Sequence, residues 1–275
     1  MTRISERNFF PNFSPRKEFL KLHRFLCDTS AFKSTGYYDD SDYSILYLLA
    51  HFFDQWELRG SFTSLEEMMY SLNLKDTSGS VSEDQLLDYV QFILNVLLFL
   101  TTIKIDPFYF ENFSSIHDST VQHCTLLMKK MNAEAKKIDN EIVVSYKNDV
   151  ATVVSSQHPE LAPSIEEYLA ISNRDDLQRK EEVLCSLAKA LEPQEQRLSK
   201  NGFQQLCSDA TFLLNKTGIR HALKPNDKID SKFLEMDDSE RIKWYDRAFT
   251  TVLACMAVLP YLDFRDEIND IKRCG

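Results

Sequence analysis

The stretch "YVQFILNVLLFLTTIKI", residues 89–105, is the most apolar part of this 275-residue chain. Gln91 and Asn95 interrupt it and Lys104 lies near its end, so it is too short and too polar for a membrane span. Ser82 provides an N-cap before it, and Pro107 ends it because a residue that precedes proline is pushed out of helical geometry. We therefore expect a long, buried helix at the centre of a helical fold.

Apolar residues at a spacing of three or four also predict helices on both sides of this stretch. One helix is expected over residues 15–27, another over 42–58, and a third begins at Ser64, whose partner Glu67 completes a capping box. Further helices are predicted over residues 114–135, 164–172, 174–191, 203–215 and 239–258.

A single strand signal stands out, "EIVVSY" at residues 141–146, preceded by the turn-forming pair Asp139–Asn140. These residues predict one short β-hairpin. Gly (6) and Pro (8) are scarce, which disfavours a sandwich or barrel built from many tight turns. The fold class we expect is mainly α, with a helical N-terminal region of unknown role over residues 1–107 and a C-terminal helical bundle over 108–275 that carries the hairpin.

Composition and cysteine spacing limit the classes of function. The formal net charge of −10 does not favour broad binding to a phosphate backbone, which needs clustered Lys and Arg. Six cysteines lie far apart with no CxxC pair, as in a protein that keeps its thiols reduced. The first residues lack the apolar core of a signal peptide. We expect a cytoplasmic protein without a membrane partner.

Motifs that bind cofactors or metals are missing from the sequence. There is no GxGxxG, no GxxxxGK[ST], no HExxH and no GxSxG, and the six histidines are dispersed. We therefore expect no cofactor and no metal site.

The segment "NKTGIRH", residues 215–221, is the strongest candidate for chemistry. Gly218 permits a left-handed turn that ends the preceding helix and leaves Arg220 and His221 at its end. A histidine can act as acid or base near neutral pH, and an adjacent arginine can hold a phosphate. The alternative is that both residues cap the helix and pair with nearby acids such as Asp227.

Three pieces of the C-terminal half resemble the abortive-infection, HEPN-type helical proteins of bacteria (higher eukaryotes and prokaryotes nucleotide-binding). They are "RKEEVLCSLAKALEPQEQRL" (179–198), "FLLNKTGIRHALKPND" (212–227) and "WYDRAFTTVLACMAVL" (244–259), and the resemblance covers residues 110–265. It implies an HEPN-like helical domain over residues 108–275, in a protein of bacterial defence or stress response. It also implies a homodimer, because HEPN ribonucleases bring two motifs together.

The resemblance assigns roles residue by residue. His221 matches the catalytic histidine and Asn215 the polar position that follows the family's arginine, whereas Leu214 stands where that arginine is expected. Arg220 and Asn215 would then steady the scissile phosphate of RNA.

Apart from the resemblance, Asp246 on the helix predicted over 239–258 is a candidate to orient His221 by accepting its ring proton. The alternative is an ordinary surface aspartate on a helix that packs against its neighbours. The leading function is a metal-independent RNA-cleaving effector, favoured by the resemblance and by the cluster of Asn215, Arg220 and His221. The alternative is a non-catalytic scaffold that dimerises or binds an operon-encoded partner protein, favoured by the acidic charge and the missing arginine.

Overall fold

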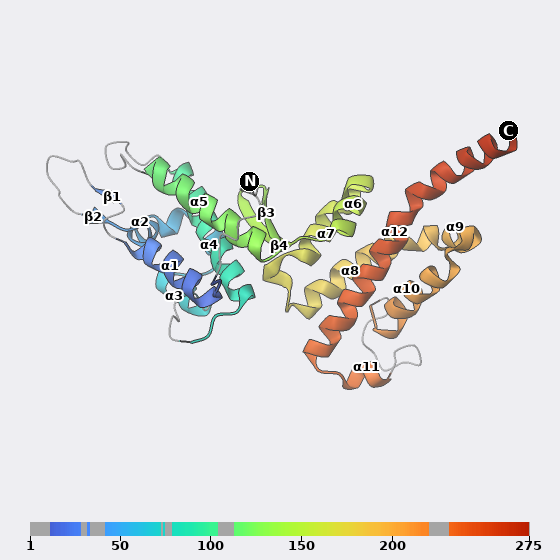
Figure 1. Cartoon of the computed structure of the whole chain (residues 1–275). Helices are drawn as coiled ribbons and strands as arrows, with labels where there is room; N and C mark the ends of the chain where they lie inside the picture. The colour runs from blue at the N-terminus through green and yellow to red at the C-terminus, as the bar shows by residue number, and fades with distance from the viewer. Residues whose placement is uncertain are drawn as a thin grey trace. The chain divides into compact units, whose positions relative to one another are not determined.

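The computed structural model describes residues 12–28, 32–33, 42–72, 74, 79–103, 113–219 and 231–274 (Figure 1). The chain is mainly α-helical, with a short antiparallel β-hairpin, as the sequence predicts. It forms two compact units that divide after Tyr146.

The first unit contains five α-helices and two strand pairs among the described residues. The bounds are α1 (Pro15–Cys27), β1 (Phe32–Lys33), β2 (Asp42–Tyr43), α2 (Ile45–His51), α3 (Leu65–Ser71), α4 (Glu83–Thr102), α5 (Phe113–Lys130), β3 (Ala133–Ile138) and β4 (Glu141–Tyr146). The antiparallel pair β1–β2 has no counterpart in the sequence prediction. The helix predicted over 42–58 is shorter than expected, because two 3₁₀ turns, Phe53–Gln55 and Glu57–Arg59, follow α2.

Helix α4 is the buried helix that the apolar stretch predicts. Ser82 and Gln85 form a capping box at its start: the Gln85 N–H donates to Ser82 Oγ (3.1 Å) and the Ser82 N–H to Gln85 Oε1 (3.0 Å). By length and composition alone, α4 and the long C-terminal helix could each cross a membrane, a test that buried core helices also pass. The most apolar window of α4 is 67% buried within the protein.

The two polar residues that interrupt the apolar stretch attach α4 to the hairpin. The Asn95 side chain donates to the Ile142 carbonyl (2.8 Å) and accepts from the Ile142 N–H (2.7 Å). Gln91 Oε1 accepts from the Val144 N–H (2.7 Å). These amides therefore satisfy the edge of β4 that β3 leaves unpaired, which a buried strand requires.

The β3–β4 hairpin confirms the predicted turn. Asp139 and Asn140 form its loop, Asp139 is left-handed (φ 51°), and Ile138 pairs with Glu141. The preceding helix ends at Lys130 instead of reaching Ala135, since Asn132 is also left-handed (φ 53°) and β3 begins at the next residue. Because α5 and the hairpin pack with α4, the first unit extends to Tyr146 and not only to the expected boundary near residue 107.

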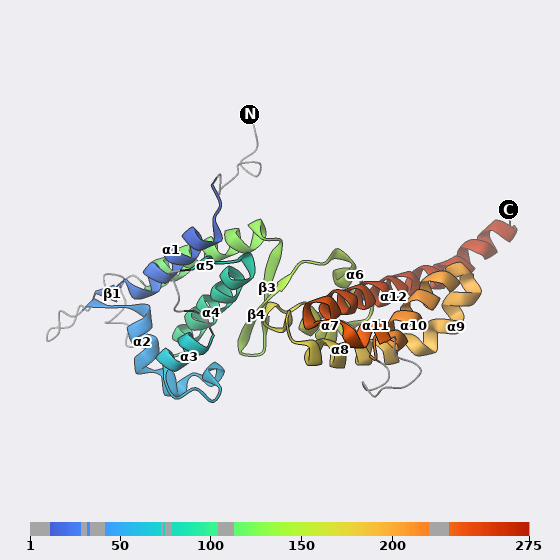
Figure 2. The same ribbon diagram turned by 90° about the horizontal axis from the view of Figure 1, so that it is seen from below.

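The second unit is a helical bundle around one long helix (Figure 2). Its helices are α6 (Asp149–Gln157), α7 (Ala162–Leu169), α8 (Leu177–Leu191), α9 (Glu195–Leu198), α10 (Gln204–Lys216), α11 (Ser231–Glu235) and α12 (Asp238–Cys274). Helix α12 contacts α6, α8 and α10. It runs well past the predicted end near residue 258, with Pro260 inside it. Leu259 and Leu262 on either side of Pro260 are buried, so packing holds this part of the helix although proline removes one backbone hydrogen bond.

Candidate functional site

The turn that carries the predicted histidine is described up to Ile219. Helix α10 ends at Lys216, and Gly218 is left-handed (φ 81°), as the sequence predicts. Ile219 is buried, and its carbonyl accepts a hydrogen bond from the Cys185 thiol of α8. The turn is thus fixed to α8 by its last described residue. Arg220 and His221 lie outside the described residues.

Leu214, which stands where HEPN ribonucleases carry arginine, faces the core of the second unit. Its side chain is fully buried (0% exposed) and belongs to the same apolar cluster as Ala210 and Val252. An arginine in this environment would need a buried partner for its charge. The position is therefore a packing position in this chain.

Asn215 is half-buried and lies on the next position of α10. It lines a broad open groove of about 710 Å³ together with residues of α9 and of α10. The lining residues are Glu192, Glu195, Gln196, Ser199, Gln204, Cys207, Ser208, Thr211, Phe212 and Asn215. Two of these residues are glutamates and none is a lysine or arginine, so the charge of the groove is opposite to that of a phosphate site.

Asp246, predicted to orient His221, braces three helices. Its Oδ1 accepts from Lys180 Nζ of α8 (2.8 Å) and from the Tyr168 hydroxyl of α7 (2.9 Å). The Lys180 side chain is 6% exposed and that of Asp246 52%. Burying an ammonium group is costly without a partner, and here Asp246 supplies the opposite charge. The predicted contact of Asp246 with His221 falls on a residue outside the described ranges.

The ring of Tyr168 completes this cluster. Lys180 Nζ lies 4.1 Å from the centroid of this ring. The ring also stacks on Phe249 of α12, with 3.9 Å between the ring centroids and 6° between the ring planes. Burial, and then the negative charge of Asp246, raise the pKa of the Tyr168 hydroxyl, so it stays a proton donor at any physiological pH. We call Tyr168, Lys180, Asp246 and Phe249 the lysine brace.

Two large aromatic residues, Trp244 and Tyr245, precede Asp246 on α12 and contact charged side chains. Tyr245 is buried, and its hydroxyl donates to Glu181 Oε2 of α8 (3.1 Å). Burial and the Glu181 charge raise its pKa. Trp244 lies under the Arg247 guanidinium at 4.5 Å. Tyr245 therefore joins α12 to α8, whereas the contact between Trp244 and Arg247 lies within α12.

In the first unit, a thiol and an imidazole lie close together at the end of α1. Cys27 Sγ is 3.7 Å from His23 Nε2, and His23 Nδ1 is 2.8 Å from the Tyr89 hydroxyl. Desolvation raises the pKa of Cys27 and lowers that of His23, so both groups favour their neutral forms. Cys27 is also the last residue of α1, where the helix dipole disfavours a thiolate. This pair is therefore poorly suited to nucleophilic catalysis.

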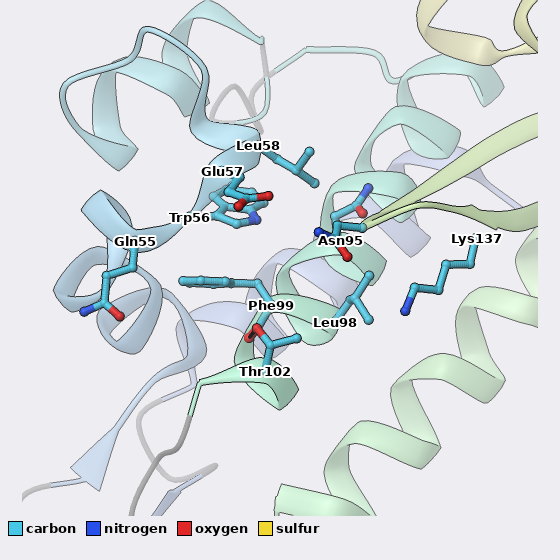
Figure 3. A pocket seen from close by; sticks show the side chains of 10 residues that line it. Gln55, Trp56, Glu57, Leu58, Asn95, Leu98, Phe99, Thr102 and Lys137 are labelled. Atoms are coloured by element: carbon cyan, nitrogen blue, oxygen red, sulfur yellow. Dashed lines mark hydrogen bonds between the residues drawn. The ribbon is translucent and has the colours of Figure 1, made fainter.

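A pocket of about 220 Å³ lies between the two 3₁₀ turns, α4 and the hairpin (Figure 3). Trp56 stacks with Phe99 at 5.9 Å between ring centroids and forms an apolar wall. Asn95 also faces the pocket, but its amide is engaged by β4. The pocket could hold a flat apolar group, and its lining includes no cysteine, histidine or serine. Sequence reasoning did not identify it, because its residues come from three separate segments.

Potential metal ligands do not gather in the described part of the chain, where no group of three or more His, Cys, Asp or Glu side chains is arranged around a common point. Comparison of the chain with protein-family models, curated proteins and solved structures finds no match.

Proposed function

We propose that the chain is a non-catalytic interaction module, in which the C-terminal helical bundle is a rigid scaffold that binds a partner protein. The lysine brace is the observation that carries this proposal. It joins α7, α8 and α12 through an almost fully buried ammonium group, an arrangement that fixes helices relative to one another. Asp246 is the acid that a catalytic histidine would need, and it is already engaged by two donors on Oδ1.

Two further features support a scaffold. Leu214 packs in the core at the position where an RNA-cleaving relative would carry its phosphate-binding arginine. Asn215 lines a groove with two glutamates, whose charge repels an RNA backbone. Like the net charge of −10, both features disfavour a site for a phosphate backbone. The proposal includes the resemblance to HEPN-type proteins: the chain would keep their helical scaffold, and a role in bacterial defence, without their catalysis.

The competing function is a metal-independent ribonuclease that uses His221 and Arg220. The experiment compares wild type, His221→Ala, Arg220→Ala and, as a matched control for loss of a cation, Lys189→Ala, an exposed residue of α8. Growth and total-RNA integrity are measured after induced expression, and purified protein is incubated with total RNA and a chelator. We expect intact RNA in every case.

Cleavage by the wild type that disappears in both His221→Ala and Arg220→Ala, with helicity unchanged and Lys189→Ala still active, would overturn the proposal. Such a result would show that the turn at the end of α10 is a catalytic element. Intact RNA with all four proteins supports the scaffold.

A further inference from the structure

Large apolar side chains form an exposed stripe along the C-terminal end of α12. They are Tyr261 (49% exposed), Phe264 (58%), Ile268 (42%) and Ile271 (73%). Their spacing of three, four and three residues places them on one side of the helix and matches positions a, d, a and d of a heptad. Figures 1 and 2 show that this end of α12 extends past α9 and α10.

The stripe is not the face that packs on the bundle. Leu262 is buried (3% exposed), and Arg265 Nη1 donates to the Asn201 carbonyl (2.7 Å). Asp263 forms an ion pair with Arg197 of α9. With 100° between successive residues, Leu262 points roughly 140° and Arg265 roughly 80° away from the centre of the stripe. The stripe is therefore open to a partner helix while α12 stays docked on its own bundle.

Charged residues on the two sides of the stripe favour one partner and one direction. Glu267 occupies position g and Lys272 position e, and both are exposed. When two copies of this helix pair in parallel, the g residue of one lies against the following e residue of the other, so Glu267 faces Lys272 of the second copy twice. An antiparallel pair sets e against e, which brings Arg265 and Lys272 of two copies together and repels.

We propose that the stripe is a dimer interface, at which α12 of a second copy of this chain packs in parallel. The inference deepens the proposed function and rests on it, since it names the partner of the scaffold. Two heptads are short for an isolated coiled coil. Here the bundle already holds α12 helical up to Leu262, which removes the cost of nucleating the helix before pairing. The pair is reversible and depends on concentration.

The test uses the purified full chain, with molar mass measured by light scattering and sedimentation over a dilution series. Wild type forms a dimer. Ile268→Glu, which places a charge in the centre of the stripe, makes it a monomer. Val153→Glu is the matched control, because Val153 is an apolar residue of α6 that is also exposed (45%) but lies outside the stripe. It leaves the dimer intact.

Charge reversal tests the direction of pairing without disturbing the fold. Glu267→Lys and Lys272→Glu each place like charges in both pairs and weaken the dimer about tenfold, and the double variant restores it to within about twofold. Ile271→Cys, in a background of Cys27→Ser and Cys274→Ser, forms a disulfide-linked dimer on oxidation, since two d positions face each other only in a parallel pair.

Several results would overturn the proposal. They are a wild type that stays monomeric at its highest soluble concentration, a dimer that survives Ile268→Glu, and a double reversal that fails to restore pairing. A monomer that binds anionic lipid vesicles through the same four residues would identify a membrane surface instead. These readouts are independent of RNA cleavage. A wild type that is monomeric and leaves RNA intact overturns only the dimer interface. Cleavage that depends on His221 overturns only the non-catalytic scaffold.

Discussion

Replacing Asp246 by alanine tests whether the lysine brace holds the second unit together. The substitution leaves the Lys180 ammonium group, 6% exposed, without its carboxylate. Removing one partner of a fully buried ion pair costs about 3–5 kcal/mol. The Asp246 side chain is 52% exposed, so water weakens the pair and also reaches the lysine more easily once the carboxylate is gone. We expect a loss of about 2 kcal/mol in the free energy of unfolding.

Removing the other partner should cost much less. Lys180→Met keeps an unbranched apolar chain between α7 and α8, and it leaves a half-exposed carboxylate that water can solvate and the Tyr168 hydroxyl still binds. We expect a change of less than about 1 kcal/mol. The double variant should resemble Lys180→Met, because without the ammonium group there is no buried charge for Asp246 to compensate. This asymmetry separates a buried cation from an ordinary surface pair.

The two tryptophans give each unit its own optical signal. Trp56 belongs to the first unit and Trp244 to the second. In a Trp56→Phe background, urea unfolding followed by fluorescence reports on the second unit alone. A 2 kcal/mol loss moves the midpoint by about 1 M for an m-value near 2 kcal/mol/M.

The reasoning would be refuted if Asp246→Ala changed the unfolding free energy by less than about 0.5 kcal/mol, or if the two single changes simply added. An unaffected stability together with His221-dependent RNA cleavage that Asp246→Ala abolishes would instead assign Asp246 to histidine orientation.

Three further predictions concern the first unit. Asn95→Ala should lower its unfolding free energy by about 2–3 kcal/mol, because the N–H and carbonyl of Ile142 lose their partner at a buried strand edge. Ser82→Ala should cost about 1 kcal/mol, since it removes the N-cap of α4. Burial lowers the pKa of His23 below its usual 6.5, so the unfolded chain takes up that proton first. Stability is therefore complete above pH 6.5 and falls below it, by at most about 1.4 kcal/mol per pH unit, and His23→Gln should flatten this dependence.

All three are measured by urea unfolding of Trp56 fluorescence in a Trp244→Phe background. Gln122→Ala, Ser119→Ala and His51→Gln are the respective controls, since each removes the same kind of group from an exposed position in this unit. An Asn95→Ala protein as stable as Gln122→Ala would contradict the hairpin attachment. A Ser82→Ala protein equal to Ser119→Ala would contradict the cap. If His51→Gln flattened the pH dependence as much as His23→Gln, burial of His23 would not be its cause.

Several local features were predictable because their causes lie within a few residues. Ser82 with Gln85 marks the start of α4, and the Asp139–Asn140 pair marks the turn of the hairpin. The apolar spacing of residues 15–27 gave the bounds of α1 correctly. Gly218 was correctly expected to end its helix in a left-handed turn. In each case the backbone conformation follows from short-range sterics and hydrogen bonds.

The errors occurred where distant contacts decide the outcome. Helix α5 stops at Lys130, although the residues as far as Ala135 fit a helix, because β3 gains a strand partner in β4. Helix α12 continues through Pro260, where a proline usually ends a helix, because the flanking leucines are buried. The boundary between the two units moves to Tyr146 because the hairpin belongs to α4.

The sequence by itself determined that the protein is mainly α-helical with one short hairpin around the Asp139–Asn140 turn, and it predicted a left-handed turn at Gly218 that ends a helix. Only the tertiary structure decided what the individual polar side chains do. Gln91 and Asn95 interrupt an apolar stretch in the sequence, and they satisfy a strand edge in the fold. Lys180 lies among charged neighbours in the sequence, and it becomes the buried centre of a brace. The physical reason is that periodicity reports which side of a helix is buried, whereas a hydrogen bond or ion pair depends on residues that folding brings together from far along the chain.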